Sequence, residues 1–425
     1  MRAILTTYIL IISYGIFAQD QILYDLDTYK RIDAEYRTTN IQPEFLFNYF
    51  NQLNSPGTNK AYFLEANGFY DDNFLVNSIN QQNNRFIDIR TEFSIGTTQS
   101  VKILTDFVKE KRKYNGEKFF KTDYQIRSRL SYFSNAGGGS NSFYQVDHDI
   151  IYGLGFGYGR LEVVNEAWLG GRILEELKRG GLLLDIPSAE AMKAFFDFLG
   201  ELRFERVMDP RLRDIYRIEK MVEYLEDVGW IESGSVPSFV TIYDTFRYET
   251  FLIRQSGERL EFTLLPLISS KLNWRKNFET VFQNRVRPGI AASTEYEIHR
   301  NGDLKYYTTM LLGGYVEYRD RLFIDNDSEQ SLSANISFDY IYRYLPSLRT
   351  NLSIASRIYS GFVNDSGYEA VLGLESRLNY DYYFSPATRL NFNAVFLYLD
   401  DKFQVGDFQP RLTFKTGVNI VHSLR

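Results

Sequence analysis

The sequence contains no cysteine among its 425 residues. It therefore forms no disulfide bond and offers no cysteine to which a lipid anchor attaches. Only 3 histidines are present, so the usual ligands of a transition-metal site are scarce. Beyond the amino-terminal run, no segment has the roughly 18 to 20 consecutive apolar residues of a membrane-spanning helix. These absences exclude a disulfide-stapled domain and a protein that crosses a membrane with helices.

Aromatic residues are abundant instead, with 32 Tyr and 34 Phe against only 10 prolines. Many of them follow a two-residue rhythm in which apolar and polar side chains alternate. This rhythm predicts β-strands with one apolar and one polar face. In the clearest strand, the apolar face consists of Leu332, Ala334, Ile336, Phe338, Tyr340, Tyr342 and Tyr344. In a second strand, it consists of Tyr368, Ala370, Leu372, Leu374, Leu378, Tyr380, Tyr382 and Phe384.

The apolar face of the first strand ends in tyrosines before a turn at Pro346, as a lipid-facing strand does where it reaches the headgroups. The alternating segments run over about 10 to 17 residues, which exceeds the usual strand of roughly 5 or 6. We predict an all-β transmembrane barrel of about 14–16 antiparallel, up-and-down strands. A large periplasmic all-β or α+β protein also alternates and is the alternative interpretation.

The amino terminus predicts export from the cytoplasm. Arg2 precedes an apolar run over residues 3–17, and Ala18 stands before the polar residues Gln19 and Asp20. This order is typical of a cleaved secretory signal, which we place at residues 1–18. Together with the strand pattern, it predicts that the protein resides in the cell outer membrane.

We divide the rest of the chain into a first part of the barrel (residues 19–159), a helical insert (160–235) and a second part of the barrel (236–425). The first part has candidate strands at residues 44–51, 61–71, 86–96, 101–111, 118–133 and 143–158. The second part has candidate strands at 239–253, 259–272, 278–285, 290–299, 304–318, 332–345, 349–359, 368–384, 390–399 and 412–424. We expect Pro266 to cause a bulge or an early strand end. Residues 19–40 form a periplasmic lead-in, an interior plug or another strand.

Helix signals replace the alternation within the insert. Three amphipathic helices are expected to begin near Asn165, Ser188 and Asp209, and glycines end the first and the third. Residues 160–232 carry 11 basic and 16 acidic residues, so nearly all of the formal net charge of −6 lies here. This charge argues against nucleic acid or an anionic membrane surface as the partner. Even strand counts on both sides place the insert in the periplasm.

Charged residues on the polar faces of the strands are expected to line the lumen, either as an open channel wall or as pairs that fill it. These residues are Arg127, Arg129, Asp339, Arg343, Arg357, Glu369, Glu375, Arg377 and Asp381. The glycine series at Gly153, Gly155, Gly157 and Gly159 leaves one face of its strand without side chains. We hypothesise that part of the insert or of the amino-terminal lead-in rests against this bare wall.

Catalytic and metal-binding signals are weak. His148 lies between Asp147 and Asp149 near a predicted loop, where its charge would simply be solvated. Hydrolysis of lipids would need a serine and a histidine together on the lipid-facing rim, and no spacing in the sequence indicates such a pair. The acidic run at 325–329 lacks the glycine and the spacing of a calcium loop. We therefore expect no enzymatic activity, no cofactor and no metal.

The junction with the insert reads Gly155-Phe-Gly157-Tyr-Gly159-Arg160-Leu-Glu162 and is followed by Ala167, Ile173 and Leu177. This segment resembles uncharacterised outer-membrane barrels of the Bacteroidota type, in which a strand with alternating glycines enters a helical insert. The likeness covers the barrel generally and about 80 residues closely. It implies an outer-membrane β-barrel and no assigned activity.

Two functions follow from these features. The first is a non-enzymatic barrel in outer-membrane lipid, whose periplasmic insert docks a protein partner in envelope assembly, secretion or transport. The second is a porin-like channel or transporter for small polar solutes, in which the insert is a plug or gate. Exposed apolar residues on the packed insert would favour docking.

Overall fold

The computed structural model describes residues 24–30, 34–51, 60–95, 98–135, 142–204, 210–247, 254–276, 280–320, 331–364, 368–385, 388–401 and 411–422. The predicted signal peptide therefore lies outside the described residues. The chain divides into two compact units. We call Met1–Tyr29 with Val164–Arg254 the helical unit, and Lys30–Val163 with Gln255–Arg425 the strand unit.

The strand unit is one antiparallel sheet in which 14 strands follow one another in sequence order. Its first six strands are β1 (Ala34–Asn51), β2 (Lys60–Ser78), β3 (Gln81–Ile95), β4 (Thr98–Asn115), β5 (Lys118–Asn135) and β6 (Ser142–Val163). The other eight are β7 (Gln255–Lys276), β8 (Thr280–Arg300), β9 (Tyr306–Arg319), β10 (Ser331–Ser347), β11 (Thr350–Asn364), β12 (Tyr368–Ser385), β13 (Thr388–Asp401) and β14 (Arg411–His422). The prediction of an up-and-down antiparallel sheet with a helical insert is confirmed.

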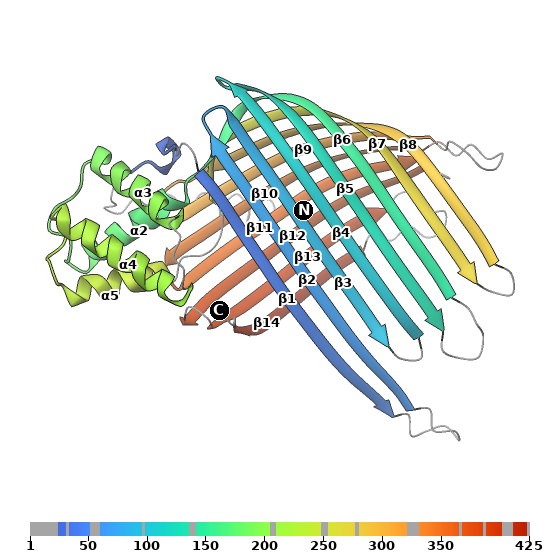
Figure 1. Ribbon diagram of the computed structural model, residues 1–425, viewed down its shortest axis with the longest axis horizontal. Coiled ribbons are helices and arrows are strands. Elements are labelled where there is room, and N and C mark those ends of the chain that lie inside the picture. The colour runs from blue at the N-terminus through green and yellow to red at the C-terminus, as the bar shows by residue number, and fades with distance from the viewer. Residues whose placement is uncertain are drawn as a thin grey trace. The chain divides into compact units, whose positions relative to one another are not determined.

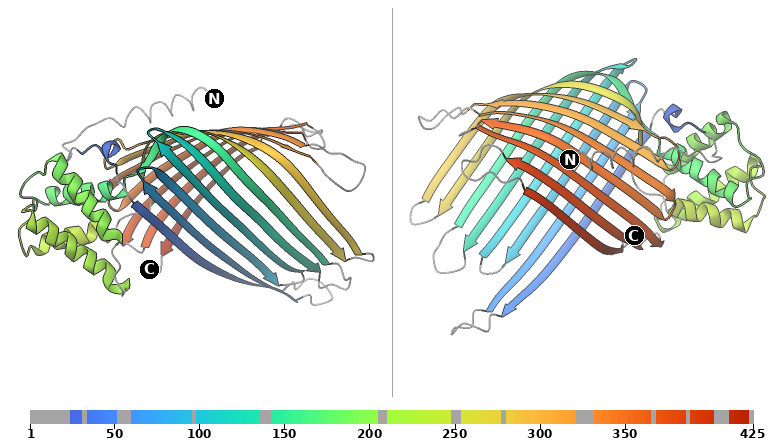
Figure 2. Two further views of the ribbon diagram at one scale, coloured as in Figure 1. Left: turned by 45° about the horizontal axis from the view of Figure 1, so that its top comes forward. Right: turned by 180° about the vertical axis from the view of Figure 1, so that it is seen from behind.

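The sheet of the strand unit curls on itself, so that β10–β14 lie behind β1–β6 (Figures 1 and 2). Long side chains on its concave side meet across several strands. Arg112 on β4, for example, bonds to Glu261 on β7. Within the described residues, β1 and β14 are the edges of the sheet, and no ladder joins them.

The strand counts on either side of the insert are even, with six before it and eight after it. Strand β6 therefore ends, and β7 begins, at the end of the sheet where β1 starts and β14 finishes. We call this the insert end and the opposite end the far end. The turns between β2 and β3, β4 and β5, and β10 and β11 at the insert end are short.

The register divides the strand residues between two faces, because directly opposed residues point to the same side. From β5 to β14, odd-numbered residues share the concave, inner face, and even-numbered residues share the outer face. Among the exposed large apolar side chains on these ten strands, all but Phe133 and Val363 lie on the outer face. The sheet thus presents apolar side chains outward and polar ones inward.

Two errors of strand assignment explain why 14 strands replace the 16 counted along the sequence: one expected strand is a helix, and two others form a single strand. In the strand expected at 239–253, residues 239–247 belong instead to helix α5 (Val236–Arg247), and residues 248–253 lie outside the described residues. Ser235 accepts a hydrogen bond from the Ser238 backbone N–H at 3.4 Å, as a helix N-cap does. Ser238, Ile242 and Thr245 are buried at helical spacing, so the β-branched and aromatic content of this segment was misleading.

The strands expected at 278–285 and 290–299 form one strand, β8. Pro288, at the expected break, pairs with Ile268 of β7, and the ladder with β9 starts only at Gly289. A proline is tolerated here because the ladder with β9 ends at Gly289, and the Pro288 carbonyl still accepts a hydrogen bond from the Asp320 N–H at 3.0 Å. Pro266 causes neither a bulge nor a strand end. Two residue pairs are absent from the β6–β7 ladder beside Pro266, but the pairs before and after this gap keep the same register.

The helical unit contains a short 3₁₀ turn, η1 (Leu26–Thr28), and helices α2 (Asn165–Arg179), α3 (Ala189–Phe204), α4 (Pro210–Asp227) and α5. Helix α2 packs against α3 and α5, and α4 packs against α5. The core includes Ile173, Phe195, Leu225 and Ile242, all fully buried. Burial raises the pKa of the Glu176 carboxyl on α2. Among the described residues, no helix is both long and apolar enough to cross a membrane.

Residues 24–29 belong to the core of the helical unit. Leu26 and Tyr29 are buried, and the Tyr29 hydroxyl donates to Asp197 Oδ1 of α3 at 3.1 Å. The rings of Tyr24 and Tyr29 meet Phe196 edge to face. Of the alternatives left open for residues 19–40, this stretch packs with the insert, and residues 34–40 begin β1.

Replacing Tyr29 by alanine should destabilise helix α3, because it removes a fully buried ring at a cost of about 3–5 kcal/mol. Tyr29→Phe keeps the ring and loses the hydroxyl bond to Asp197, so it should cost about 1 kcal/mol. Hydrogen exchange of the α3 amides measures both effects. The exposed neighbour Lys30→Ala is the control, and equal protection in all three variants would contradict the packing.

Candidate functional site

All nine residues that we predicted to line the lumen lie on the inner face of the sheet. Asp339, for instance, opposes Arg357, which in turn opposes Glu375. The same alternation places Arg127, Arg129, Arg343, Glu369, Arg377 and Asp381 on this face. The sequence therefore assigns the residues to a face, but it does not indicate which of them contact one another.

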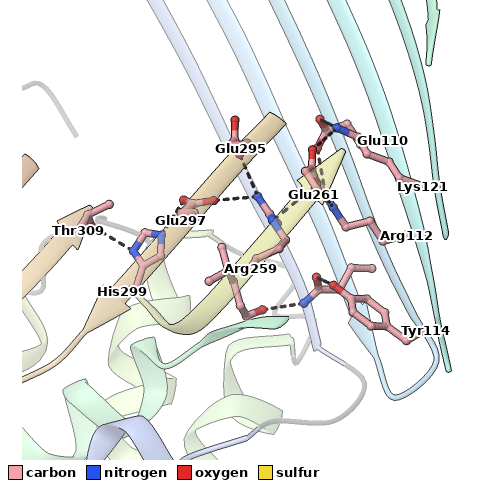
Figure 3. Close-up of polar contacts among 12 residues, drawn as sticks. Glu110, Arg112, Tyr114, Lys121, Arg259, Glu261, Glu295, Glu297, His299 and Thr309 are labelled. Atoms are coloured by element: carbon pink, nitrogen blue, oxygen red, sulfur yellow. Dashed lines mark hydrogen bonds and ion pairs between the residues drawn. The ribbon is translucent and has the colours of Figure 1, made fainter. Parts of the chain in front are cut away.

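The densest polar cluster on the inner face was not predicted, and it lies toward the insert end (Figure 3). Glu261 of β7 accepts hydrogen bonds from Arg112 at 2.9 Å and from Lys121 at 2.6 Å. Glu110 pairs with the same two cations at 3.1 Å. The Arg112 and Lys121 side chains are only 5% and 6% exposed. The four residues form an electrically balanced group away from solvent.

The glycines of β6 create the space for this cluster. Strand β6 lies between β5 and β7, yet Gly155 and Gly157 put no side chain between Lys121 and Glu261. A Cβ atom at Gly157 would lie 2.3 Å from Phe119, and one at Gly155 would lie 2.6 Å from a backbone oxygen of β7. The atoms nearest to these glycines belong to β5 and β7. Side chains of neighbouring strands thus occupy the wall where we expected the insert or lead-in to rest.

A second group continues the cluster across β8 and β9. Arg259 donates to Glu297 at 2.8 Å and lies 3.5 Å from Glu295. His299 Nε2 is 2.6 Å from Glu297, and its Nδ1 is 2.7 Å from the Tyr307 hydroxyl. Thr309 also approaches Nδ1, at 3.1 Å. The order hydroxyl, imidazole, carboxylate is that of a catalytic triad, but His299 and Tyr307 are buried, so no substrate reaches them.

The predicted insert junction, Gly155 to Glu162, connects β6 to the β2–β3 turn. Arg160 donates to the backbone oxygens of Ser78 and Ile79, each at 2.7 Å, and pairs with Glu162 at 2.8 Å. Glu162 accepts from Asn77 of β2 at 2.8 Å. Gly159 has a φ of 86°, and any Cβ there would clash with the Glu258 oxygen at 2.3 Å. Glycine at this position lets β6 and β7 twist closely together.

Gln82 and Tyr114 extend this junction into β3 and β4. Gln82 donates to the Leu161 carbonyl at 2.7 Å and to Asn77 at 2.9 Å. The Tyr114 hydroxyl donates to Gln82 at 2.7 Å, and the Arg160 guanidinium lies 4.8 Å from the centre of the Tyr114 ring. The end of β6 is therefore fixed to strands that are three and four places away in the sheet.

The remaining lumen residues are more open. Arg127 and Arg129 are exposed, and Arg357 lies 3.4 Å from Asp339. Arg377 contacts Glu375 and is 60% exposed. Asp381 accepts from Asn351 and Asn391. Arg343 lies 6.0 Å from the Tyr307 ring, and the Glu369 side chain lies outside the described residues.

The structure brings one further pair together that sequence reasoning missed. His148 Nδ1 lies 2.8 Å from Ser128 Oγ, and both residues are on the outer face. The two residues are 20 positions apart in the sequence, and they face each other only because of the register between β5 and β6. Among the described residues, no group of three or more His, Asp or Glu side chains could hold a metal ion.

No protein-family model matches the chain. No curated protein matches it either. Among solved structures, the beta domain of the Bordetella autotransporter BrkA aligns with 81% of this chain and 99% of its own, at 8% identity and a TM-score of 0.27. A TM-score this low supports no conclusion about fold or function.

Glu261→Gln should lower the stability of the strand unit by about 3 kcal/mol, because it leaves buried cations without one of their two carboxylates. The matched control is Glu92→Gln, which removes a carboxylate from an exposed pair with Lys102 and should cost at most about 1 kcal/mol. Denaturant unfolding of the refolded protein in detergent measures both. Equal shifts of the midpoint would contradict a structural role for the cluster.

Proposed function

We propose that the strand unit is an integral outer-membrane β-barrel. The observation that carries this proposal is the exposed apolar outer face, which continues across β5–β14. Its most exposed members include Phe156, Ile268, Leu264, Val316, Ile336, Ile358, Leu412, Phe414, Val418 and Ile420. Proteins in water rarely expose apolar surface on this scale, whereas a barrel in lipid requires it.

Aromatic side chains lie at both ends of this face, as in the girdles of membrane barrels. Tyr132, Tyr144 and Trp274 pack in a row at the far end with tilted rings, whose centres are 4.5 and 4.8 Å apart. Tyr306 stacks on Tyr344 at the insert end. Along β6, the distance from Tyr144 to Tyr158 projects to about 35 Å for a typical strand rise and tilt. This span fits a bilayer core with its interfaces.

Adjacent residues of β10 allow a direct test. Ile336→Arg puts a charge on the outer face and should cost about 2–4 kcal/mol if that face contacts lipid. Asn335→Arg puts the same charge on the exposed inner face and should be nearly neutral. Unfolding after reconstitution in phospholipid vesicles measures the difference, and two equal costs would argue against a lipid-facing outer wall.

We further propose that the helical unit is periplasmic and docks a protein partner. Its packing leaves several large apolar side chains exposed, among them Leu184 at 65% and Val236 at 71%, with Ile186 and Val228. The Leu184 N–H donates to the Trp230 carbonyl at 2.9 Å, so the α2–α3 and α4–α5 connections meet at one end of the unit. We call these four residues the loop-end patch. Docking through this patch needs no catalytic group.

Photo-cross-linkers at Leu184 and Val236 should capture the same envelope protein in intact cells. Glu201, an exposed residue on α3, is the control position and should yield no specific product. Leu184→Asp should abolish capture from Val236 while leaving the barrel folded. Identical products from Glu201, or none from either patch position, would contradict docking at this patch.

A channel is the second candidate function, because Arg127, Arg357 and Arg377 are each more than half exposed on the inner face. Charges exposed on facing walls would give a passage for small polar solutes mild selectivity. Single-channel recordings of the intact chain, and of a variant without residues 164–254, test this. Openings only in the variant would make the helical unit a plug, and silence from both folded proteins would exclude a channel.

A further inference from the structure

Ser128 and His148 form a hydrogen-bonded pair on the outer wall of the sheet. They oppose each other on β5 and β6, and His148 Nδ1 lies 2.8 Å from Ser128 Oγ. This distance is within the range of a nucleophile and its general base. His148 is exposed and therefore open to a substrate from outside the barrel. The buried His299 has no such access.

The neighbours of the pair along β5 and β6 are apolar, whereas Thr105 of β4 opposes Ser128 and Ser270 of β7 opposes His148. On the same face, Ile126 and Leu130 flank Ser128, and Val146 and Ile150 flank His148. An ionisable side chain that faces lipid is costly, and such residues are retained mainly where they have a function. The neighbouring acids do not explain the histidine, because Asp147 and Asp149 point to the inner face, where they bond to Gln145 and Ser269.

The depth of the pair in the membrane also fits a lipid substrate. An apolar band about 25 Å tall covers roughly ten residues of a tilted strand. Centred between Tyr144 and Tyr158, the band begins close to Val146, which puts His148 about 5 Å inside its far edge. The ester linkages of phospholipids lie near this boundary between hydrocarbon and headgroups.

We propose that Ser128 and His148 hydrolyse acyl esters of membrane glycerophospholipids. This inference rests on the proposed membrane location of the outer face and departs from the sequence-based expectation of a protein without enzymatic activity. Ser270 of β7 opposes His148 on its other side. Opposed side chains of this kind come within reach of each other, so its hydroxyl is placed to orient the imidazole.

The reaction has two steps, with Ser128 as nucleophile and His148 as base. Ser128 Oγ attacks the ester carbonyl carbon and gives its proton to His148 Nδ1. The carbon–oxygen bond to glycerol then breaks, and His148 returns the proton to the leaving oxygen, which releases a lysophospholipid and leaves an acyl-serine. A water molecule, deprotonated by His148, attacks the acyl-serine, which releases a fatty acid and restores Ser128.

The test uses the full chain refolded into phosphatidylethanolamine vesicles that carry a labelled acyl chain. We expect slow release of labelled fatty acid and lysophospholipid, and covalent labelling of Ser128 by a fluorophosphonate. Ser128→Ala should abolish the labelling, and both Ser128→Ala and His148→Gln should lower release on the order of 100-fold or more.

The control is Ser356→Ala, because Ser356 bonds to Ser376 at 3.1 Å on the outer face with no histidine opposite it. It should keep full release. Flotation with the vesicles checks insertion of every variant. A protein that floats and folds but releases no more fatty acid than Ser128→Ala overturns the hydrolase and leaves the barrel proposal intact. Failure of the intact protein to float overturns both.

Discussion

The Glu261 carboxylate is the interaction on which the inner face depends. It lies on β7 and neutralises cations of β4 and β5, so it links strands on both sides of the helical insertion. A buried ion pair is favourable only when its geometry is good and its partners are complete, and Glu110 completes this one. Arg259 then extends the group to Glu297 and His299. The concave wall near the insert end is therefore a connected polar structure.

This network requires that β6, the strand between Lys121 and Glu261, carries no side chain on its inner face at this point. Any side chain at Gly155 or Gly157 would occupy the path between Lys121 and Glu261 and would meet atoms of β5 or β7 at less than 3 Å. Two glycines with positive φ, Gly159 and Gly257, then bring β6 and β7 close together just before the chain enters the helical unit and just after it returns. The glycine series thus has a structural explanation that requires neither the insert nor the amino-terminal lead-in to rest against it.

Alternation along the chain predicted the faces of the strands well, because it is a local property that burial enforces residue by residue. It failed at 239–253, where a serine cap and helical spacing outweighed β-branched composition. It also failed at Pro288, where a proline is acceptable because the ladder with β9 does not extend to it. The sequence did not indicate which inner-face side chains contact one another. Glu261 and Arg112 are 149 positions apart, and only the combined registers of β4 through β7 bring them together. Ser128 and His148 were missed for the same reason.

The sequential order of the strands also has a consequence for folding. Every ladder joins neighbours that a short connection brings together, except the one between β6 and β7, which are separated by residues 164–254. Closing a long loop costs more entropy than closing a hairpin turn, and such contacts form late. We therefore expect the ladders within β1–β6 and within β7–β14 to form before the ladder between β6 and β7. Folding of the helical unit beforehand would shorten the open segment and speed formation of the β6–β7 ladder.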